Sequence, residues 1–350
     1  MSGFVADVAV QPAVVRRVLA AAEGRLDRPL RAAAALLQRH PERPVLVVGM
    51  GSSLSAGRIV HSLLVPAGRL VLLEDAGELL HYGLGAVANA GCVIAISQSG
   101  RSAETVRVIE QLRGSGGVPV VAVVNDPGSP VAAGADVVLD VDAGLEAAVA
   151  TKTYVATIAV LALLVGRIVP GAPTREDLAR VADEMELQLH ETDGTRGARH
   201  LAGCPAIVVV GRGPSLGAAD YAALTIKETA AIPAEAMSGG AFRHGPLELT
   251  ASEVGLIVLA PAGSTARLAA AMAREVAARG GRTWLLTEAA LAHTPGDPDE
   301  LQTTIVPDLP ESLAQLACAV PLQLAAAELA RGAGRNAGVT LVATKVTDRE

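Results

Sequence analysis

Aromatic side chains and cysteines are scarce in this sequence of 350 residues. Aromatic residues make up 2% of the chain, whereas hydrophobic residues make up 51%. The interior must therefore be filled by valine, leucine, isoleucine and alanine, the usual filling of parallel sheets covered by helices. Three cysteines, Cys92, Cys204 and Cys318, lie far apart and lack metal-ligand spacing. This pattern excludes a disulfide framework and suits reduced thiols in a cytosol.

Excess positive charge, an export signal and a membrane-spanning run are also missing. The formal net charge is -7, so no basic field attracts a phosphate backbone and we expect no nucleic-acid partner. Residues 1–10 lack the basic start and long apolar core of a signal peptide. The longest apolar stretch, Tyr154 to Val165, is too short to span a bilayer and predicts a buried helix. We therefore expect a cytoplasmic protein without a membrane segment.

An internal repeat organises the chain, whose length allows two domains. The segment PVLVVGMGSSLSAG (44–57) is echoed by AIVVVGRGPSLGAA (206–219), and CVIAISQSGRSAE (92–104) is echoed by GLIVLAPAGSTAR (255–267). A third apolar strand, 118–126, has its counterpart at 282–288. Apolar strands that alternate with helices imply right-handed crossovers. The sequence thus predicts an α/β fold of two duplicated domains, each a doubly wound parallel sheet flanked by helices in three layers.

Segments outside the repeat complete the predicted organisation. Apolar residues at helical spacing between Val14 and Leu37 predict an N-terminal helical arm, and Pro173-Thr174 followed by two acidic residues predicts a helix start. We expect a helical arm at 1–40, a first domain at 41–172, a linker at 173–200, a second domain at 201–332 and a C-terminal tail at 333–350.

A serine-rich turn follows the second repeated strand of the first half. Ligands of doubly wound sheets bind at the carboxyl ends of the strands, where helix N-termini direct unpaired N–H groups at an anion. Hydroxyl and amide groups add donors at this position, and Gly100 lets the backbone come close. The sequence predicts a phosphate cradle made of Ser52, Ser53, Ser97, Gln98, Ser99 and Ser102.

The simplest alternative is that these serines only cap helices, and for a single serine that interpretation would be preferred. Five serines on two adjacent turns favour the cradle. The second half has Ala260, Pro261 and Ala262 at the equivalent positions, so only the first half is predicted to bind phosphate. A nucleotide site is set aside, because the G-x-G-x-x-G spacing fails at Leu54 and no Walker G-K-[ST] run is present.

Ionisable residues gather in the segment 224–246 of the second half. Lys227, Glu228, Glu235 and His244 lie there in a mostly small, apolar context. A helix end with solvated charges is an equally good explanation for Lys227 or Glu235 alone. A carboxylate and an imidazole are the natural pair for moving protons on a sugar. Glu228 and His244 are therefore candidate catalytic residues, and Lys227 and Glu235 are candidate substrate contacts.

Motifs in both halves carry a family resemblance. In chain order they are G-S-S, S-Q-S-G, A-T-K-T-Y, I-K-E, A-E-A and R-H-G-P. With these motifs the chain resembles the tandem sugar-isomerase (SIS) domain family, especially the isomerase portion of glucosamine-6-phosphate synthase and the stand-alone aminosugar-phosphate isomerases and deaminases. The resemblance implies a phosphorylated aminosugar as the substrate and a homodimer as the assembly.

The resemblance also implies roles for single residues. The residues of the predicted cradle hold the sugar phosphate, with help from the segment from Val149 to Thr151. Glu228 moves a proton between C1 and C2, and His244 assists ring opening from the partner subunit. In the tail, Lys345 closes over the open-chain sugar and can form an imine with its carbonyl. The alternative for Lys345 is a solvated terminal lysine.

The sequence departs from the family pattern at three places. It has no N-terminal glutaminase domain and no cysteine near the start, so we expect no glutamine-dependent amide transfer. The D-x-P-R element that commonly precedes the tail lysine is replaced by NAGVTLVA (336–343). Ala241 stands where relatives often carry a glutamate just before the R-H-G-P motif.

Three functions remain open at this point. With a free amine at C2 of the sugar, proton transfer gives a ketimine that hydrolyses to ketose phosphate and ammonia, and this deaminating isomerase is the function we favour. With an acetylated amine, the C3 hydroxyl can leave as water, and the protein is a dehydratase. Neither route needs a metal or redox cofactor, and no ligand cluster demands one. The third possibility is a non-catalytic phosphosugar-binding regulator.

Overall fold

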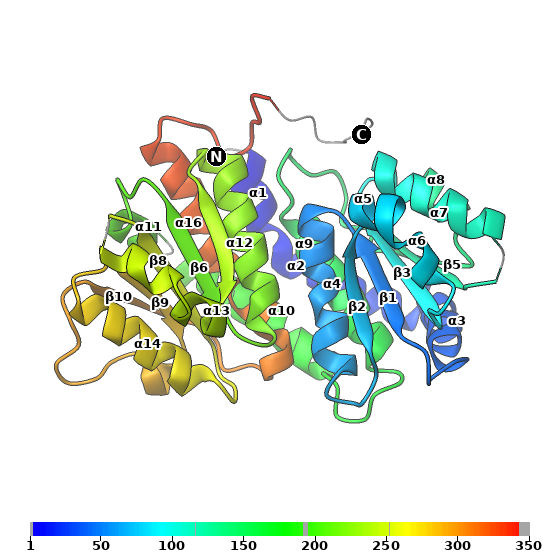
Figure 1. Cartoon of the computed structure of the whole chain (residues 1–350), viewed down its shortest axis with the longest axis horizontal. Helices are drawn as coiled ribbons and strands as arrows, with labels where there is room; N and C mark the ends of the chain where they lie inside the picture. The colour runs from blue at the N-terminus through cyan, green and yellow to red at the C-terminus, as the bar shows by residue number, and fades with distance from the viewer. Residues whose placement is uncertain (1–2, 116, 192–194, 252, 343–350) are drawn as a thin grey trace. The chain divides into compact units, whose positions relative to one another are not determined.

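The described part of the chain forms two compact units. The structure is a computed structural model that describes residues 3–115, 117–191, 195–251 and 253–342. Described residues of 13–145 and 152–179 form the first-half unit, and those of 3–12, 146–151 and 180–341 form the second-half unit. Figure 1 labels elements of both units where there is room.

The first-half unit is built on a five-stranded parallel sheet with the order β2-β1-β3-β4-β5. Its strands are β1 (Val45–Gly49), β2 (Val71–Asp75), β3 (Cys92–Ser97), β4 (Val120–Val124) and β5 (Val137–Asp140). Its longer helices are α3 (Asp27–Gln38), α4 (Gly51–Leu64), α7 (Ala103–Ser115) and α9 (Lys152–Val165). Its shorter helical segments are α5 (Ala76–Glu78), the π-helix η1 (Leu79–Gly83), α6 (Leu84–Val87) and α8 (Pro130–Ala133). Two further helices, α2 (Gln11–Glu23) and α10 (Arg175–Glu191), contain residues of both units.

The second-half unit has a second parallel sheet with the order β10-β9-β8-β6-β7. Its strands are β6 (Ile207–Gly211), β7 (Ala234–Ser238), β8 (Gly255–Ala260), β9 (Thr283–Thr287) and β10 (Leu301–Ile305). Its α-helices are α1 (Gly3–Ala9), α11 (Arg196–His200), α12 (Ser215–Ala230), α13 (Gly239–Arg243), α14 (Ala266–Ala278), α15 (Ala314–Ala317) and α16 (Ala319–Gly332). Its 3-10 turns are η2 (Pro246–Ala251), η3 (Ala289–Leu291) and η4 (Glu311–Leu313).

The two sheets have the same topology. Numbered within its own half, each sheet has the order 2-1-3-4-5, and every strand pair is parallel. The predicted repeat pairs correspond to β1 with β6, β3 with β8, and β4 with β9. The predicted duplication into two doubly wound α/β sheets is therefore confirmed. The structure adds two edge strands to each half that the sequence analysis did not find.

Alternating residues of the first sheet pack against helices on its two faces. Leu46, Val48 and Val93 belong to a buried cluster that also contains residues of α7, α8 and the 76–87 segment. On the opposite face, α4 lies so close that a Cβ on Gly57 would come within 2.6 Å of Val47 Cγ1. The sheet therefore forms the middle of three layers, as predicted.

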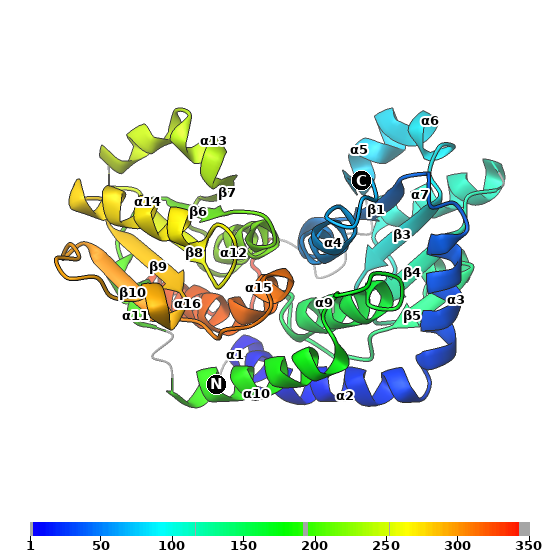
Figure 2. The ribbon, with the colours of Figure 1, turned by 90° about the horizontal axis from the view of Figure 1, so that it is seen from below.

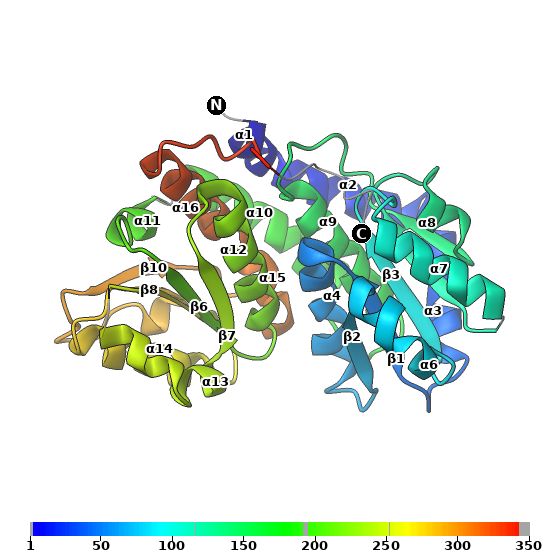
Figure 3. The same cartoon turned by 45° about the horizontal axis from the view of Figure 1, so that its top comes forward.

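The second sheet is covered in the same way. In Figure 2, α14 lies on one side of the sheet and α16 lies on the other. Val208, Val210 and Leu285 pack toward α14, while Ile207, Val209 and Ile257 pack toward α12 and α16. Figure 3 shows α12 beside β6 and β7, in agreement with the contacts between these elements. Alternation of inward-facing residues along each buried strand produces this arrangement.

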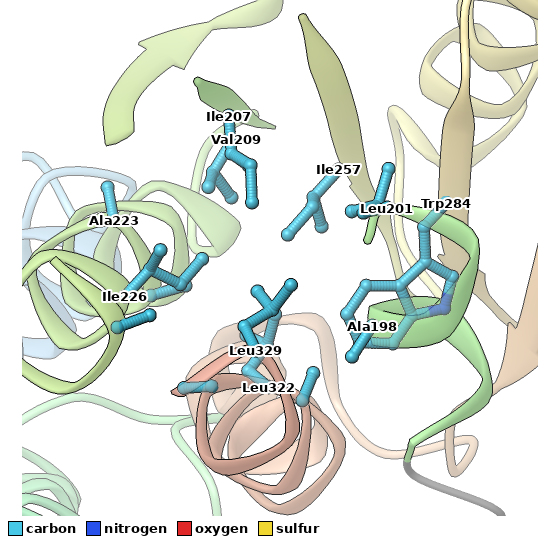
Figure 4. Packing of buried hydrophobic residues seen from close by; sticks show 14 of the residues in the cluster. Ala198, Leu201, Ile207, Val209, Ala223, Ile226, Ile257, Trp284, Leu322 and Leu329 are labelled. Carbon is cyan, nitrogen blue, oxygen red and sulfur yellow. The ribbon is translucent and has the colours of Figure 1, made fainter. Parts of the chain in front are cut away.

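The single tryptophan anchors the larger core cluster of the second-half unit. Trp284 is fully buried on β9, and its indole Nε1 donates to Thr304 Oγ1 at 2.9 Å. A Cβ on Gly197 would lie 2.1 Å from the indole ring, so only glycine fits beneath it. Figure 4 shows Ala198 of α11 and Leu322 and Leu329 of α16 around this core. The one tryptophan of the chain therefore fills the space between α11 and the second sheet.

Three predicted helical features have clear counterparts. Helix α9 is buried along its whole length, which confirms the buried helix expected over Tyr154 to Val165. Thr174 Oγ1 accepts from the Asp177 N–H at 3.1 Å while the Asp177 carboxylate accepts from the Thr174 N–H at 2.8 Å, so a reciprocal cap begins α10. The helical stretch expected between Val14 and Leu37 corresponds to α2 and α3. Helix α1 precedes them and contacts α16, and Phe4 and Val8 are buried in the same core cluster.

One run among the described helices has the length and apolar composition to cross a membrane. This run is Glu311–Gly332, and 83% of its most apolar 18-residue window is buried inside the protein. Its buried residues pack against α12 and the second sheet. The apolar composition therefore has an explanation in core packing.

Candidate functional site

The predicted phosphate cradle lies at the carboxyl edge of the first sheet. Ser97 is the last residue of β3, and Ser52 and Ser53 lie in the first turn of α4, which follows β1. Since β1 and β3 are adjacent strands whose helices start on opposite faces, their first turns border the crevice at the topological switch point. Helix N-termini and serine hydroxyls at such a place can bind an oxyanion.

Local hydrogen bonds shape the turn of residues 97–102. Ser97 Oγ and Ser102 Oγ are 3.2 Å apart, and Ser99 Oγ accepts from the Arg101 N–H at 3.1 Å. Gln98 is partly buried, and its carbonyl accepts from the Asn125 N–H at 3.0 Å. The Arg101 guanidinium donates to Asp126 at 3.0 Å and lowers the pKa of that carboxyl. These bonds hold the turn against the loop that follows β4.

Gly100 is required by the conformation and by the space available. Its φ is +62°, in the left-handed region. An added Cβ would lie 1.9 Å from Ser129 Oγ. Ser129 is itself fully buried, so it has little room to move. A side chain at position 100 would therefore push the turn away from the sheet edge.

The equivalent turn of the second half is closed by a carboxylate of the protein itself. Glu311 Oε2 accepts from the Ser264 N–H at 3.0 Å, and Glu311 Oε1 accepts from Ser264 Oγ at 3.2 Å. A Cβ on Gly263 would come within 2.4 Å of Glu311 Cδ. In the turn that corresponds to the phosphate cradle, a side-chain anion thus takes the backbone and hydroxyl donors.

The segment Glu146–Thr151 belongs to the second-half unit. Val149 is buried in the large core cluster of that unit. Thr151 is fully buried, and both its N–H and its hydroxyl donate to Glu146 Oε1, at 2.8 and 3.0 Å. The Tyr221 hydroxyl donates to the Ala150 carbonyl at 2.7 Å. Hydrogen bonds and core packing therefore fix the 146–151 segment, which contains the stretch from Val149 to Thr151 named by the family resemblance, to the second-half unit.

Glu228 has the properties expected of a general base. It lies on α12 and is partly buried, and its Oε2 atom is buried without a hydrogen-bond partner. Burial raises the pKa of Glu228 to about 7, and the charge of Lys227 opposes this shift only in part. A carboxyl group whose pKa is near neutrality, and one of whose oxygens has no hydrogen-bond partner, can both accept and return a proton.

The other predicted residues of the second half are exposed. Lys227 lies beside Glu228 on α12, and Glu235 lies on β7. His244 directly follows α13. Ser238 caps the N-terminus of α13, because its Oγ accepts from the Ala241 N–H at 3.1 Å. No hydrogen bond or ion pair between described residues joins His244 or Glu235 to Glu228. Lys345 lies outside the described residues.

Three residues that support the site were not found from the sequence. Glu146 and Tyr221 hold the 146–151 segment, and Glu275 of α14 forms a 2.7 Å ion pair with Arg243, the neighbour of His244. Tyr221 offered one usable signal, because it is one of three tyrosines and lies seven residues before Glu228. Nothing in the sequence marked Glu146, although its partner Thr151 is only five residues away. Glu275 lies 32 positions from its partner Arg243 and on another helix.

The fold and these groups define a class of protein: a duplicated doubly wound α/β protein in which one half has a serine-rich turn at the carboxyl edge of its sheet and the other has a partly buried carboxylate. The family comparison agrees with this description. The SIS domain profile matches residues 40–167 and 200–331. The chain therefore belongs to the SIS domain family, which confirms the resemblance inferred from its motifs.

Curated relatives are similar to this chain over part of their length. Glutamine–fructose-6-phosphate aminotransferase [isomerizing] of Pyrococcus horikoshii is 34% identical over 300 residues, which cover 83% of this chain and 49% of the relative. The protein of the same name from Zymomonas mobilis is 31% identical over 297 residues, with 82% and 49% covered. The chain thus spans about half the length of the curated relatives it matches.

Solved structures share the fold over nearly the whole chain. The C-terminal domain of glucosamine-fructose-6-phosphate aminotransferase from Francisella tularensis superposes with a TM-score of 0.82 at 22% identity, covering 96% of this chain and 97% of that one. Glucosamine-6-phosphate deaminase from Thermotoga maritima superposes with a TM-score of 0.73 at 17% identity, covering 99% of both chains. At these identities the likeness concerns the fold.

Proposed function

We propose that this protein is an aminosugar-phosphate isomerase that releases ammonia from a hexosamine 6-phosphate. The observation that carries the proposal is Glu228, a partly buried carboxylate with a pKa near 7 and an unpartnered buried oxygen. Membership of the SIS domain family and similarity to aminotransferases described as isomerizing support the same class of chemistry. In this proposal the first half binds the phosphate and the second half moves the proton.

The proposed reaction begins with anchoring and ring opening. The turns of residues 52–53 and 97–102 bind the phosphate through hydroxyls and helix N-termini. His244 assists the opening of the pyranose ring, which frees an aldehyde at C1. The aldehyde makes the C2 hydrogen acidic, because the carbanion formed at C2 is delocalised onto the carbonyl oxygen.

Proton transfer and hydrolysis complete the proposed reaction. The ionised Glu228 removes the C2 proton to give an enolamine, and the protonated Glu228 returns that proton to C1 while the nitrogen loses a proton and O1 gains one. The product is a ketimine at C2. Water adds to the ketimine carbon and ammonia leaves, so one hexosamine phosphate and one water give one ketose phosphate and one ammonia. A pKa near 7 suits both directions of transfer at neutral pH.

A dehydratase is the second candidate. It uses the same base, but an acetylated amine blocks the ketimine route and the C3 hydroxyl leaves as water. The tail keeps this alternative open, because NAGVTLVA (336–343) replaces the D-x-P-R element expected before the tail lysine. Both reactions need the cradle and Glu228, so the substrate decides between them.

The deciding experiment offers the purified protein glucosamine 6-phosphate and N-acetylglucosamine 6-phosphate separately, and follows ammonia and products by NMR. We expect ammonia and fructose 6-phosphate from the free amine. An unsaturated product from the acetylated sugar would establish the dehydratase instead. Binding without any product would overturn the enzyme proposal in favour of a regulator. The double variant Ser99→Ala, Ser102→Ala is the control for binding, and Glu228→Gln is the control for chemistry.

A further inference from the structure

A buried tyrosine connects the helix of Glu228 to the 146–151 segment. Tyr221 lies on α12 and is 1% exposed. Its hydroxyl donates to the Ala150 carbonyl at 2.7 Å and accepts from Gln323 Nε2 at 2.9 Å. Gln323 Oε1 in turn accepts from Gln11 Nε2 at 2.5 Å. Two buried glutamines therefore fix the direction in which this hydroxyl donates.

The same segment is held at two further points. Glu146 accepts both donors of Thr151, and the Ala147 N–H donates to Asp7 Oδ2 at 2.7 Å. These bonds connect the segment to itself and to α1. The hydrogen bond from the Tyr221 hydroxyl connects the segment to α12, the helix that carries Glu228.

Helix geometry places Tyr221 and Glu228 on one face of α12. They are seven residues apart, which corresponds to about two helical turns and a rise of roughly 10 Å. Burial raises the pKa of Tyr221, and the charges of Glu146 and Glu228 add to this shift. Tyr221 therefore lies about two turns before Glu228 on the same side of α12.

We propose that Tyr221 is a positioning residue, whose hydroxyl fixes the carbonyl of Ala150 and thereby sets Val149 and Thr151 relative to the helix of Glu228. This inference rests on the proposed function of the site. A phenylalanine at position 221 fills almost the same space but leaves the Ala150 carbonyl and the Gln323 amide without their partner. A buried polar group that loses its partner destabilises the arrangement that buried it.

The first test is amide hydrogen exchange of ligand-free Tyr221→Phe. We expect exchange in the peptide that covers residues 146–151 to become about ten-fold faster, with little change in the strands of the same sheet. The matched control is Thr229→Val, because Thr229 Oγ1 is a buried hydroxyl on α12 that contacts the Thr225 and Ala326 carbonyls and does not touch the segment. Unchanged exchange at 146–151 in Tyr221→Phe would overturn the proposal. This readout needs no turnover, so it separates failure of this inference from failure of the proposed function.

Kinetics provide the second test. We expect kcat/KM of Tyr221→Phe on the sugar phosphate to fall about ten-fold, with the pH midpoint of the profile unchanged, because the base itself is untouched. Normal kcat/KM in a variant with faster exchange would reduce Tyr221 to a structural residue. If Tyr221→Phe does not fold, Gln323→Leu loosens the same hydroxyl from its other side. Faster exchange confined to 146–151 in that variant supports the proposal, and unchanged exchange contradicts it.

Discussion

Among single residues, Glu228 combines two properties that oppose stability and favour chemistry. One oxygen of this partly buried carboxylate has no hydrogen-bond partner, so the group loses hydration that the nearby charge of Lys227 offsets only in part. The raised pKa expresses this loss, because the neutral form is favoured in the folded protein. A residue kept under these conditions is a better candidate for proton transfer than the exposed Glu235.

Glu228→Gln should make the protein more stable at alkaline pH. The pKa of about 7 in the folded protein lies above the usual value near 4.3, so stability falls as pH rises through this window and then levels off. The neutral amide removes this effect. We expect a gain on the order of 2–3 kcal/mol in the free energy of unfolding at pH 8, and almost none at pH 4.

Urea denaturation at the two pH values measures this gain. Glu235→Gln is the matched control, because Glu235 is exposed and no such pH dependence is expected from it. A difference between Glu228→Gln and the native protein that does not change with pH would argue against a raised pKa at this position.

Gly100→Ala should damage the cradle. The new Cβ would collide with Ser129. The φ of residue 100 is also unfavourable for alanine. We expect a loss of roughly 1–3 kcal/mol in the free energy of unfolding and at least about ten-fold weaker phosphosugar binding by calorimetry. Gly68→Ala is the matched control, because Gly68 has a φ of +83° and nothing within 4 Å of an added Cβ. Similar binding losses in both variants would mean that strain alone, and not the contact with Ser129, explains the effect.

At the level of elements, the sequence revealed the strands that are buried on both faces. Every residue of β1, β3, β4 and of β6, β8, β9 is buried, so these strands appear as continuous apolar runs. The edge strands β2, β5, β7 and β10 are only partly buried and contain charged or polar residues such as Glu74 and Gln302. The sequence analysis recognised strands by their continuous apolar runs, and the edge strands lack such runs.

The candidate site was predictable where its residues are neighbours in the chain. The serines of 97–102 stood out because the second half has other residues in the same turn. The bond between Tyr221 and Ala150 joins residues 71 positions apart, so only the folded structure reveals it. The closure of the second turn by Glu311 has the same origin, since Glu311 lies 47 positions from Ser264.

Glu311→Ala should loosen the turn that follows β8. Its carboxylate takes both donors of Ser264, and their loss leaves the turn without its acceptor. We expect the free energy of unfolding to fall by about 1–2 kcal/mol and the Ser264 amide to exchange faster with solvent. Glu248→Ala, at an exposed position of η2, is the control. Equal effects of the two substitutions would show that the contact with Ser264 does not stabilise the turn.

At the level of the whole molecule, the two halves share one strand topology but differ in the side chains that their turns and helices carry. The first half has the open serine turn, and the second half has Glu228 and a turn closed by Glu311. If His244 acts from the partner subunit, as the family resemblance implies, one complete set of residues requires two copies of the chain.

Mixing two inactive variants tests this dimer. We expect Glu228→Gln and His244→Ala to be inactive alone, and to recover about a quarter of native activity after joint unfolding and refolding. In a symmetric dimer, half of the randomly paired molecules are mixed, and one of the two sites in each has both native residues. If both residues act from one chain, no mixed molecule contains a complete set, and the activity stays at the level of the separate variants. A size measurement confirms that pairing occurred.

The packing of α1 against α16 has a consequence for biosynthesis. Phe4 and Val8 belong to the same cluster as Leu322 and Leu329, more than 300 residues later in the chain. At about 5–20 residues per second, a ribosome needs roughly 15 to 60 seconds to make the intervening chain. During that interval Phe4 and Val8 lack the part of their native cluster that α16 supplies. The core around α1 is thus completed only after α16 has been synthesised.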